Sequence, residues 1–137
     1  MALTHLVDTS VLVRMRDPAI RDVVEPGAER GELARAGISD LEIGYSARDE
    51  GEWDRLTTAL GVFELVETTG AHLQRARQVQ RMLAGRHQRG RKVPDLLVAA
   101  AAEAKRLVVL HYDADFDRIA KVTGQRCAWA VPPGAVD

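Results

Sequence analysis

The sequence predicts an α/β fold, in which helices cover both faces of a central, mostly parallel sheet in three α/β/α layers. Short apolar runs typical of strands alternate with longer segments whose apolar residues recur at helical spacing. Strands separated by helices favour parallel pairing, because each crossover covers a face of the sheet. The 137 residues show no internal repeat or linker and are enough for one hydrophobic core. We therefore assign residues 1–137 to a single domain.

The elements follow from these patterns in chain order. Strands are expected at residues 3–7, 33–38, 62–66, 107–110 and 128–131. Helices are expected after Asp8, from Pro18, from Ser39, and over residues 50–60, 71–84, 95–104 and 113–121. Pro18 fits the first turn of a helix, whereas the Glu25-Pro26-Gly27 sequence indicates the end of that helix. Gly61 and Gly124 are expected to stop their helices.

Composition excludes several classes of protein. No apolar run approaches the roughly 20 residues of a membrane span, and residues 1–5 lack the features of a signal peptide. The single cysteine, Cys127, excludes an internal disulfide framework and favours the reducing cytoplasm. Residues 71–94 contain no acid but seven arginines and lysines, although the net charge is only −1. A basic face beside an acidic pocket suits a metal-dependent enzyme acting on a polyanion; a solvated helix face is the alternative.

Acidic residues follow the predicted strands. Asp8 follows the first strand, Glu42 lies one helical turn after the second, and Asp113 and Asp115 follow the strand at residues 107–110. Ligands bind beyond the carboxyl ends of the strands in an open α/β sheet. We therefore expect these acids to lie at one edge, and Asp95 joins them if its helix begins over that edge.

Each acid also has a purely structural explanation. Asp8 can cap a helix and Asp95 can stabilise a helix N-terminus, while Ser39 and Glu42 fit a capping box. Clustering argues against caps alone, since two charges about 4 Å apart repel by roughly 4 kcal/mol at an effective dielectric of 20. Oxygen ligands favour Mg²⁺ or Mn²⁺, and the regularly spaced His and Cys residues of a zinc site are missing.

Four stretches resemble the PIN-domain ribonucleases, specifically the VapC-type toxins of VapBC toxin–antitoxin modules. They are LVDTSVL at residues 6–12, SDLEIGYSA at 39–47, PDLLVAAAA at 94–102 and LHYDADF at 110–116. The resemblance implies a metal-dependent endoribonuclease with a compact α/β/α domain. It also implies a type II toxin that forms a homodimer and is neutralised by a small antitoxin, whose arginine can pair with the acids.

The resemblance assigns roles to the acids. Its first three acids correspond to Asp8, Glu42 and Asp95, and either Asp113 or Asp115 supplies the fourth. Asp8 and Asp95 are then expected to bind Mg²⁺, or Mn²⁺, directly. Glu42, Asp113 and Asp115 act through water or hold a second ion, and Asp113 ranks before Asp115 because it lies nearer the strand end.

Other polar residues receive supporting roles. Ser10 matches the polar position after the first acid and can orient that acid or bind water. The implied reaction is in-line attack of water on a phosphodiester, which leaves a 5′-phosphate and a 3′-hydroxyl. An exposed basic loop is expected to bind RNA phosphates through Arg86, Arg89, Arg91 and Lys92. A solvated linker is the alternative interpretation of this loop.

Two other functional classes stay open at this point. Asp113 and Asp115 have the Asp-x-Asp spacing of haloacid-dehalogenase-type phosphatases, although those enzymes place the motif after their first strand. A non-catalytic nucleic-acid-binding module would use the acids as caps and need no metal. The early helices can also expose an apolar surface to the antitoxin or to a second protomer, or bury the same residues in the core: Val23, Val24, Leu41 and Tyr45.

Overall fold

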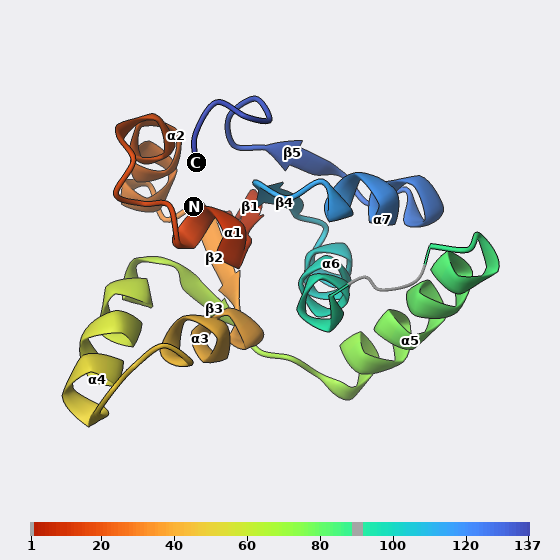
Figure 1. Cartoon of the computed structure of the whole chain (residues 1–137), viewed down its shortest axis with the longest axis horizontal. Coiled ribbons are helices and arrows are strands. Elements are labelled where there is room, and N and C mark those ends of the chain that lie inside the picture. Colours follow the sequence, from red (N-terminus) through yellow and green to blue (C-terminus); the bar gives the residue numbers. More distant parts are fainter. Residues whose placement is uncertain (1, 89–91) are drawn as a thin grey trace.

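The computed structural model describes residues 2–88 and 92–137 and has a parallel sheet at its centre (Figure 1). Its strands are β1 (His5–Val7), β2 (Leu33–Ala36), β3 (Glu64–Val66), β4 (Val108–His111) and β5 (Cys127–Trp129). They lie in the order β3-β2-β1-β4-β5, and every neighbouring pair is parallel. The predicted α/β fold is therefore confirmed, and β1 lies at the middle of the sheet.

The helices connect successive strands and cover the sheet. They are α1 (Thr9–Leu12), α2 (Pro18–Glu29), α3 (Gly37–Gly44), α4 (Glu50–Thr58), the 3-10 helix η1 (Ala59–Val62), α5 (Gly70–Gly85), α6 (Val93–Lys105) and α7 (Asp115–Thr123). Within the described ranges, no helix combines the length and the apolar character required to cross a membrane.

Two apolar cores lie on opposite faces of the sheet. Leu6 and Val109 join one core, with side chains of α5, α6 and α7. Val7 and Leu110, the next residues along the same strands, join the other core with α1, α2 and η1. Because successive strand residues point to opposite faces, this alternation produces the three α/β/α layers.

Helix α6 packs against one face of the sheet and contacts β1, β2 and β4. Its residues 95–102 are all buried, and four consecutive alanines let the helix approach the strands closely. The helix ends where Arg106 takes the left-handed conformation, with φ of 58°. This close packing fixes the N-terminus of α6, and with it Asp95, relative to β1 and β4.

Several predicted boundaries were wrong for tertiary reasons. Helix α2 continues through Pro26 to Glu29, and Gly27 within it packs closely enough on Leu33 of β2 that an added Cβ would come within 3.1 Å. Helix α3 begins at Gly37, so Ser39 lies inside the helix. Gly61 does not end a helix but lies within η1, which follows α4 directly. Gly124 does end α7, with φ of 75°.

Candidate metal centre

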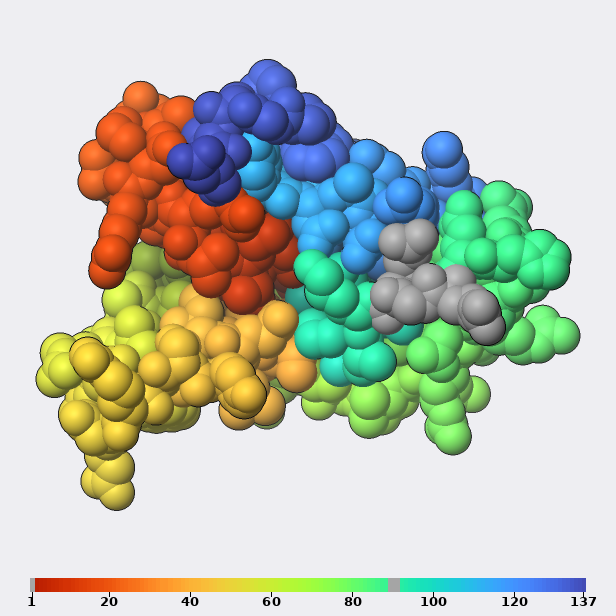
Figure 2. Space-filling model, viewed as in Figure 1, coloured from red at the N-terminus to blue at the C-terminus, as the bar shows by residue number. Residues whose placement is uncertain are grey.

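The predicted convergence of acids occurs at a cavity of about 230 Å³. Four segments that are distant in sequence meet there: α1 with its cap, α3, the start of α6 and the turn after β4 (Figure 2). The lining residues are Asp8, Thr9, Ser10, Val13, Arg14, Glu42, Lys92, Asp95, Tyr112 and Asp113. Asp115 is not among them, but carboxylate oxygens of Asp95, Asp113 and Asp115 all lie within 4.8 Å of one another. The two groupings share Asp95 and Asp113.

Asp8 caps α1 and lines the cavity at the same time. Its Oδ2 accepts a hydrogen bond of 2.9 Å from the Ser10 amide, and its own amide donates to the Leu110 carbonyl at 2.9 Å. The side chain is 3% exposed. Burial raises the pKa of Asp8, and the hydrogen bonds from Ser10 offset only part of this increase. The capping explanation and the metal-site explanation are therefore compatible.

Asp95 lies in the first turn of α6 and is 5% exposed. Its Oδ2 is buried and has no hydrogen-bond partner among the described residues. Burial, together with the negative charges of Asp8 and Asp113, raises the pKa of Asp95 to about 7. A buried carboxylate oxygen that lacks a partner is costly, and a cation bound in this cavity would satisfy it.

Glu42 does not form the capping box that the sequence suggested. Its Oε1 lies 2.7 Å from Thr9 Oγ1, which is also 2.8 Å from Ser39 Oγ. The carboxylate of α3 is thus held against α1 rather than against its own helix start. Burial raises the pKa of Glu42 despite the hydrogen bond from Thr9. Sequence analysis missed Thr9, whose only signal is a hydroxyl between the first acid and Ser10.

The turn after β4 holds the last two acids. Asp113 Oδ1 accepts a bond of 2.9 Å from the Asp115 amide, and the Asp113 amide donates to His111 Nδ1 at 3.2 Å. Lys92 Nζ lies 2.7 Å from Asp113 Oδ2. Burial alone would raise the pKa of Asp113, but the bonds from Lys92 and from the Asp115 amide outweigh it, and the pKa is lowered. Asp113 thus forms the ion pair with Lys92, whose charge also acts to lower the pKa values of Glu42 and Asp95.

Some of the predicted supporting residues lie at the cavity and others do not. The Ser10 amide orients Asp8, while the Ser10 hydroxyl accepts from the Tyr112 amide at 2.9 Å and so links α1 to the turn after β4. Of the predicted RNA-binding residues, Lys92 lines the cavity. Arg86 is exposed at the end of α5 and is not part of the lining. Arg89 and Arg91 lie outside the described residues.

The donor atoms fit a hard divalent cation. The cavity offers carboxylate oxygens, and neither His nor Cys is among its described lining residues, which matches Mg²⁺ or Mn²⁺ better than zinc. His111 is nearby but fully buried, and its Nδ1 is used by the Asp113 amide. The donor set and the partnerless Asp95 oxygen together make this acidic cluster the candidate metal site.

Comparison with known proteins agrees with this geometry. Residues 5–122 match the family model described as PIN domain. The chain is 61% identical over 137 residues to Ribonuclease VapC51 of Mycobacterium tuberculosis, with both chains covered completely. It is 43% identical over 136 residues to Ribonuclease VapC21 of the same species, covering 98% of this chain and 99% of that protein.

Solved structures show the same fold at lower identity. DNA-bound VapBC from Salmonella typhimurium aligns with a TM-score of 0.77 at 18% identity, covering 94% of this chain and 99% of that one. VapBC2 from Rickettsia felis, bound to a promoter DNA fragment, aligns with a TM-score of 0.75 at 18% identity, covering 93% and 98%. From the family match and the full-length identity, the chain belongs to the PIN-domain family and, within it, to the VapC ribonucleases.

Proposed function

We propose that this chain is a metal-dependent endoribonuclease and the toxin component of a type II toxin–antitoxin system. Asp8 and Asp95 would bind Mg²⁺, or Mn²⁺, directly, with Glu42, Asp113 and Asp115 completing the site. The observation that carries the proposal is Asp95, which lines a cavity of converging acids and whose buried Oδ2 has no hydrogen-bond partner among the described residues. The ribonuclease names of its full-length relatives support the reaction class.

The residues divide the work of phosphodiester hydrolysis. A bound divalent ion supplies Lewis acidity, which makes water a better nucleophile and neutralises charge on the phosphate. Asp8 and Asp95 provide buried ligand oxygens, and Thr9 holds Glu42 toward them. Lys92 offsets the charge of Asp113 and offers a cation to the approaching RNA. Water then attacks in line, leaving a 5′-phosphate and a 3′-hydroxyl.

RNA cleavage tests this proposal directly. We expect cutting of structured RNA in Mg²⁺ to stop with EDTA and to fall by at least about a hundredfold in Asp8→Asn and Asp95→Asn, because each change removes a charged ligand. Asp22→Asn is the matched control, since Asp22 is exposed on α2. Cutting by both site variants at the wild-type rate would refute the nuclease site. RNA binding without any cutting, unaffected by EDTA, would favour the non-catalytic binding module instead.

The position of the Asp-x-Asp sequence argues against the phosphatase alternative. The Asp113-Ala114-Asp115 sequence follows β4, whereas the first strand is β1 with Asp8 at its end. Family membership points to RNA as the substrate class. Absence of a covalent aspartyl-phosphate after incubation with phosphorylated substrates is the expected result.

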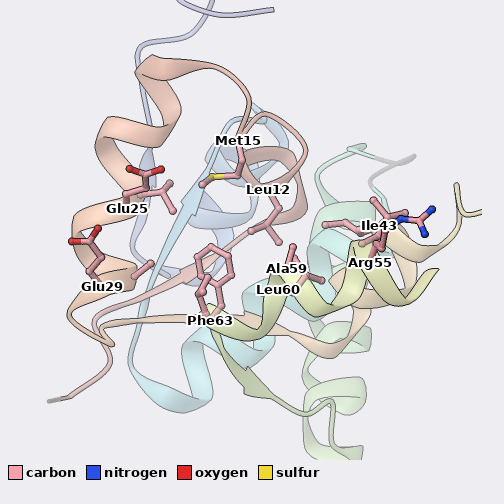
Figure 3. Close-up of a pocket in the computed structure, with 13 residues that line it drawn as sticks. Leu12, Met15, Glu25, Glu29, Ile43, Arg55, Ala59, Leu60 and Phe63 are labelled. Carbon is pink, nitrogen blue, oxygen red and sulfur yellow. The ribbon is translucent and has the colours of Figure 1, made fainter. Parts of the chain in front are cut away.

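An apolar groove is the surface that we propose for the antitoxin. It has a volume of about 610 Å³ and lies between α2 and the α4–η1 segment (Figure 3), where Figure 2 shows the surface hollowed. Leu12, Met15 and Phe63 supply apolar walls, while Glu25 and Glu29 stand at its edge. Such a groove suits an amphipathic helix with basic flanks.

Growth of a bacterial host tests the toxin activity. Expression of the protein should arrest growth, and expression of Asp95→Asn should not.

The exposed apolar residues of α3 lie outside this groove. Leu41 is 64% exposed and Tyr45 is 92% exposed, whereas Val24 is fully buried. We place Leu41 and Tyr45 at a homodimer contact, and Tyr45→Asp is expected to shift the mass measured by light scattering toward the monomer. A cytoplasmic location fits the single cysteine, Cys127, which has no second cysteine in the chain with which to form a disulfide.

A further inference from the structure

Arg14 is a second cation at the rim of the acidic cavity, and neither the sequence patterns nor the family assignment gives it a role. It lies just after α1 and lines the cavity together with Asp8 and Asp113. Its Nη1 donates to the Ser10 carbonyl at 2.6 Å, and its Nε donates to the main-chain oxygen of Asp137 at 2.8 Å. The guanidinium lies over the Tyr112 ring, 4.9 Å from its centroid.

These contacts orient Arg14 through main-chain oxygens, one of them on the last residue of the chain, and involve no acidic side chain. They use two of its three nitrogens and two main-chain oxygens, and Nη2 makes no hydrogen bond to a group in the described part of the chain. Stacking on Tyr112 restricts the side chain before any ligand binds, which lowers the entropy lost on binding. A fixed guanidinium with an unused donor is well suited to a phosphate oxygen.

The position of Arg14 relative to Lys92 suggests what it binds. Arg14 approaches the cavity from α1, whereas Lys92 approaches it from the N-terminus of α6, and Asp8 and Asp95 also line the space that they share. The acids of this cavity repel the RNA phosphates. RNA can therefore be held there only if cationic side chains of the protein bind the phosphates next to the scissile one. We propose that Arg14 binds a phosphate next to the scissile one, so that the RNA strand crosses the acids between Arg14 and Lys92. This inference rests on the proposed ribonuclease function.

The dependence of RNA affinity on salt tests the proposal. A short fluorescein-labelled single-stranded RNA is titrated in Mg²⁺ with protein that carries Asp95→Asn, so that the RNA is not cut. Adding Arg14→Gln should weaken binding about tenfold and lower the slope of log affinity against log salt by about 0.7, the value for one phosphate contact to a single strand. Arg14→Lys should keep most of the slope. Arg21→Gln, on the exposed face of α2, should change neither quantity.

A second pair of measurements separates RNA binding from a structural role. Arg14 and Tyr112 both hold the last residues of the chain, since Tyr112 Oη donates to the Val136 carbonyl at 2.7 Å. A variant that ends at Pro133 removes these contacts but keeps Arg14, and it should retain the salt slope. In the Asp95→Asn protein that keeps Arg14, RNA should also protect Arg14 from an arginine-modifying dicarbonyl, as read by mass spectrometry, and this measurement does not depend on the folding of Arg14→Gln.

The possible outcomes are distinct. An unchanged slope in Arg14→Gln, an equal loss of slope in the variant ending at Pro133, or no protection of Arg14 by RNA would each overturn the inference. The proposed function is tested separately by RNA cutting with Asp95 intact. If that protein cuts RNA while Arg14→Gln keeps the full slope, only the role of Arg14 is wrong. If it does not cut RNA in Mg²⁺ or Mn²⁺, the proposed function fails.

Discussion

At the scale of single residues, Asp95 combines a helix-terminal position with almost complete burial. Sequence patterns alone left it between a helix-stabilising acid and a metal ligand, because both uses place an aspartate in the first turn of a helix. The structure shows Lys92, not Asp95, at the N-cap position. The burial of Asp95 and its partnerless Oδ2 are tertiary properties. They could not be derived from residues 93–105 alone.

The raised pKa of Asp95 predicts how stability depends on pH. Its folded-state pKa of about 7 lies above the ordinary value of 3.8, so ionisation costs free energy in the folded protein only. The resulting stabilisation is complete below about pH 4 and is lost as pH rises through 7. In EDTA, the melting temperature of the wild type relative to Asp95→Asn should therefore fall between pH 5 and 8, by roughly 3–10 °C. A constant difference across this range would contradict the raised pKa.

Thr9 predicts a positioning effect on Glu42. Thr9→Val keeps the side-chain shape but removes the hydroxyl that lies 2.7 Å from Glu42 Oε1. We expect Mn²⁺ affinity, measured by calorimetry, to fall about tenfold, as is typical when a partner of a metal ligand is lost. Thr9→Ser, which retains a hydroxyl, serves as the control and should bind Mn²⁺ like the wild type. Equal affinity in Thr9→Val would show that Glu42 does not depend on Thr9.

At the scale of elements, tertiary packing determined helix ends and capping contacts that local sequence patterns did not predict. Helix α2 passes Pro26, and its Gly27 packs closely on Leu33, although the sequence read alone indicates a helix end. Helix α5 forms a capping box between Thr69 and His72, whereas the expected box at Ser39 and Glu42 is replaced by contacts with α1. Local propensity thus located the elements but not all of their ends.

The contact between α3 and α4 predicts a stability effect. A Cβ added at Gly44 would collide with the Trp53 indole, so Gly44→Ala must displace α4 or shift α3, which carries Glu42. We expect a loss of roughly 1–3 kcal/mol in the free energy of unfolding, measured by urea denaturation. Gly61→Ala is the control, because an added Cβ there meets no atom within 4 Å. Equal stability of both variants would show that Trp53 moves aside freely.

At the scale of the whole molecule, the parallel topology explains why the sequence predicted so much of the site. Parallel strands bring their carboxyl ends to one edge, and β1 lies between β2 and β4, so Asp8, Glu42 and Asp113 meet although they are distant in sequence. The rule concerns strand ends and contains no information about side-chain partners. The pairing of Lys92 with Asp113 and the place of Arg14 at the rim depend on side-chain geometry, and they became evident only in three dimensions.

The central claim is that these acids hold the divalent ion used to cut RNA. Anomalous diffraction from crystals grown with Mn²⁺ tests it most directly. We predict an anomalous peak in the acidic cavity, about 2.2 Å from carboxylate oxygens of both Asp8 and Asp95, that disappears in Asp95→Asn. A protein that cuts RNA in Mn²⁺ but shows no peak beside these two residues at saturating Mn²⁺ would contradict the account.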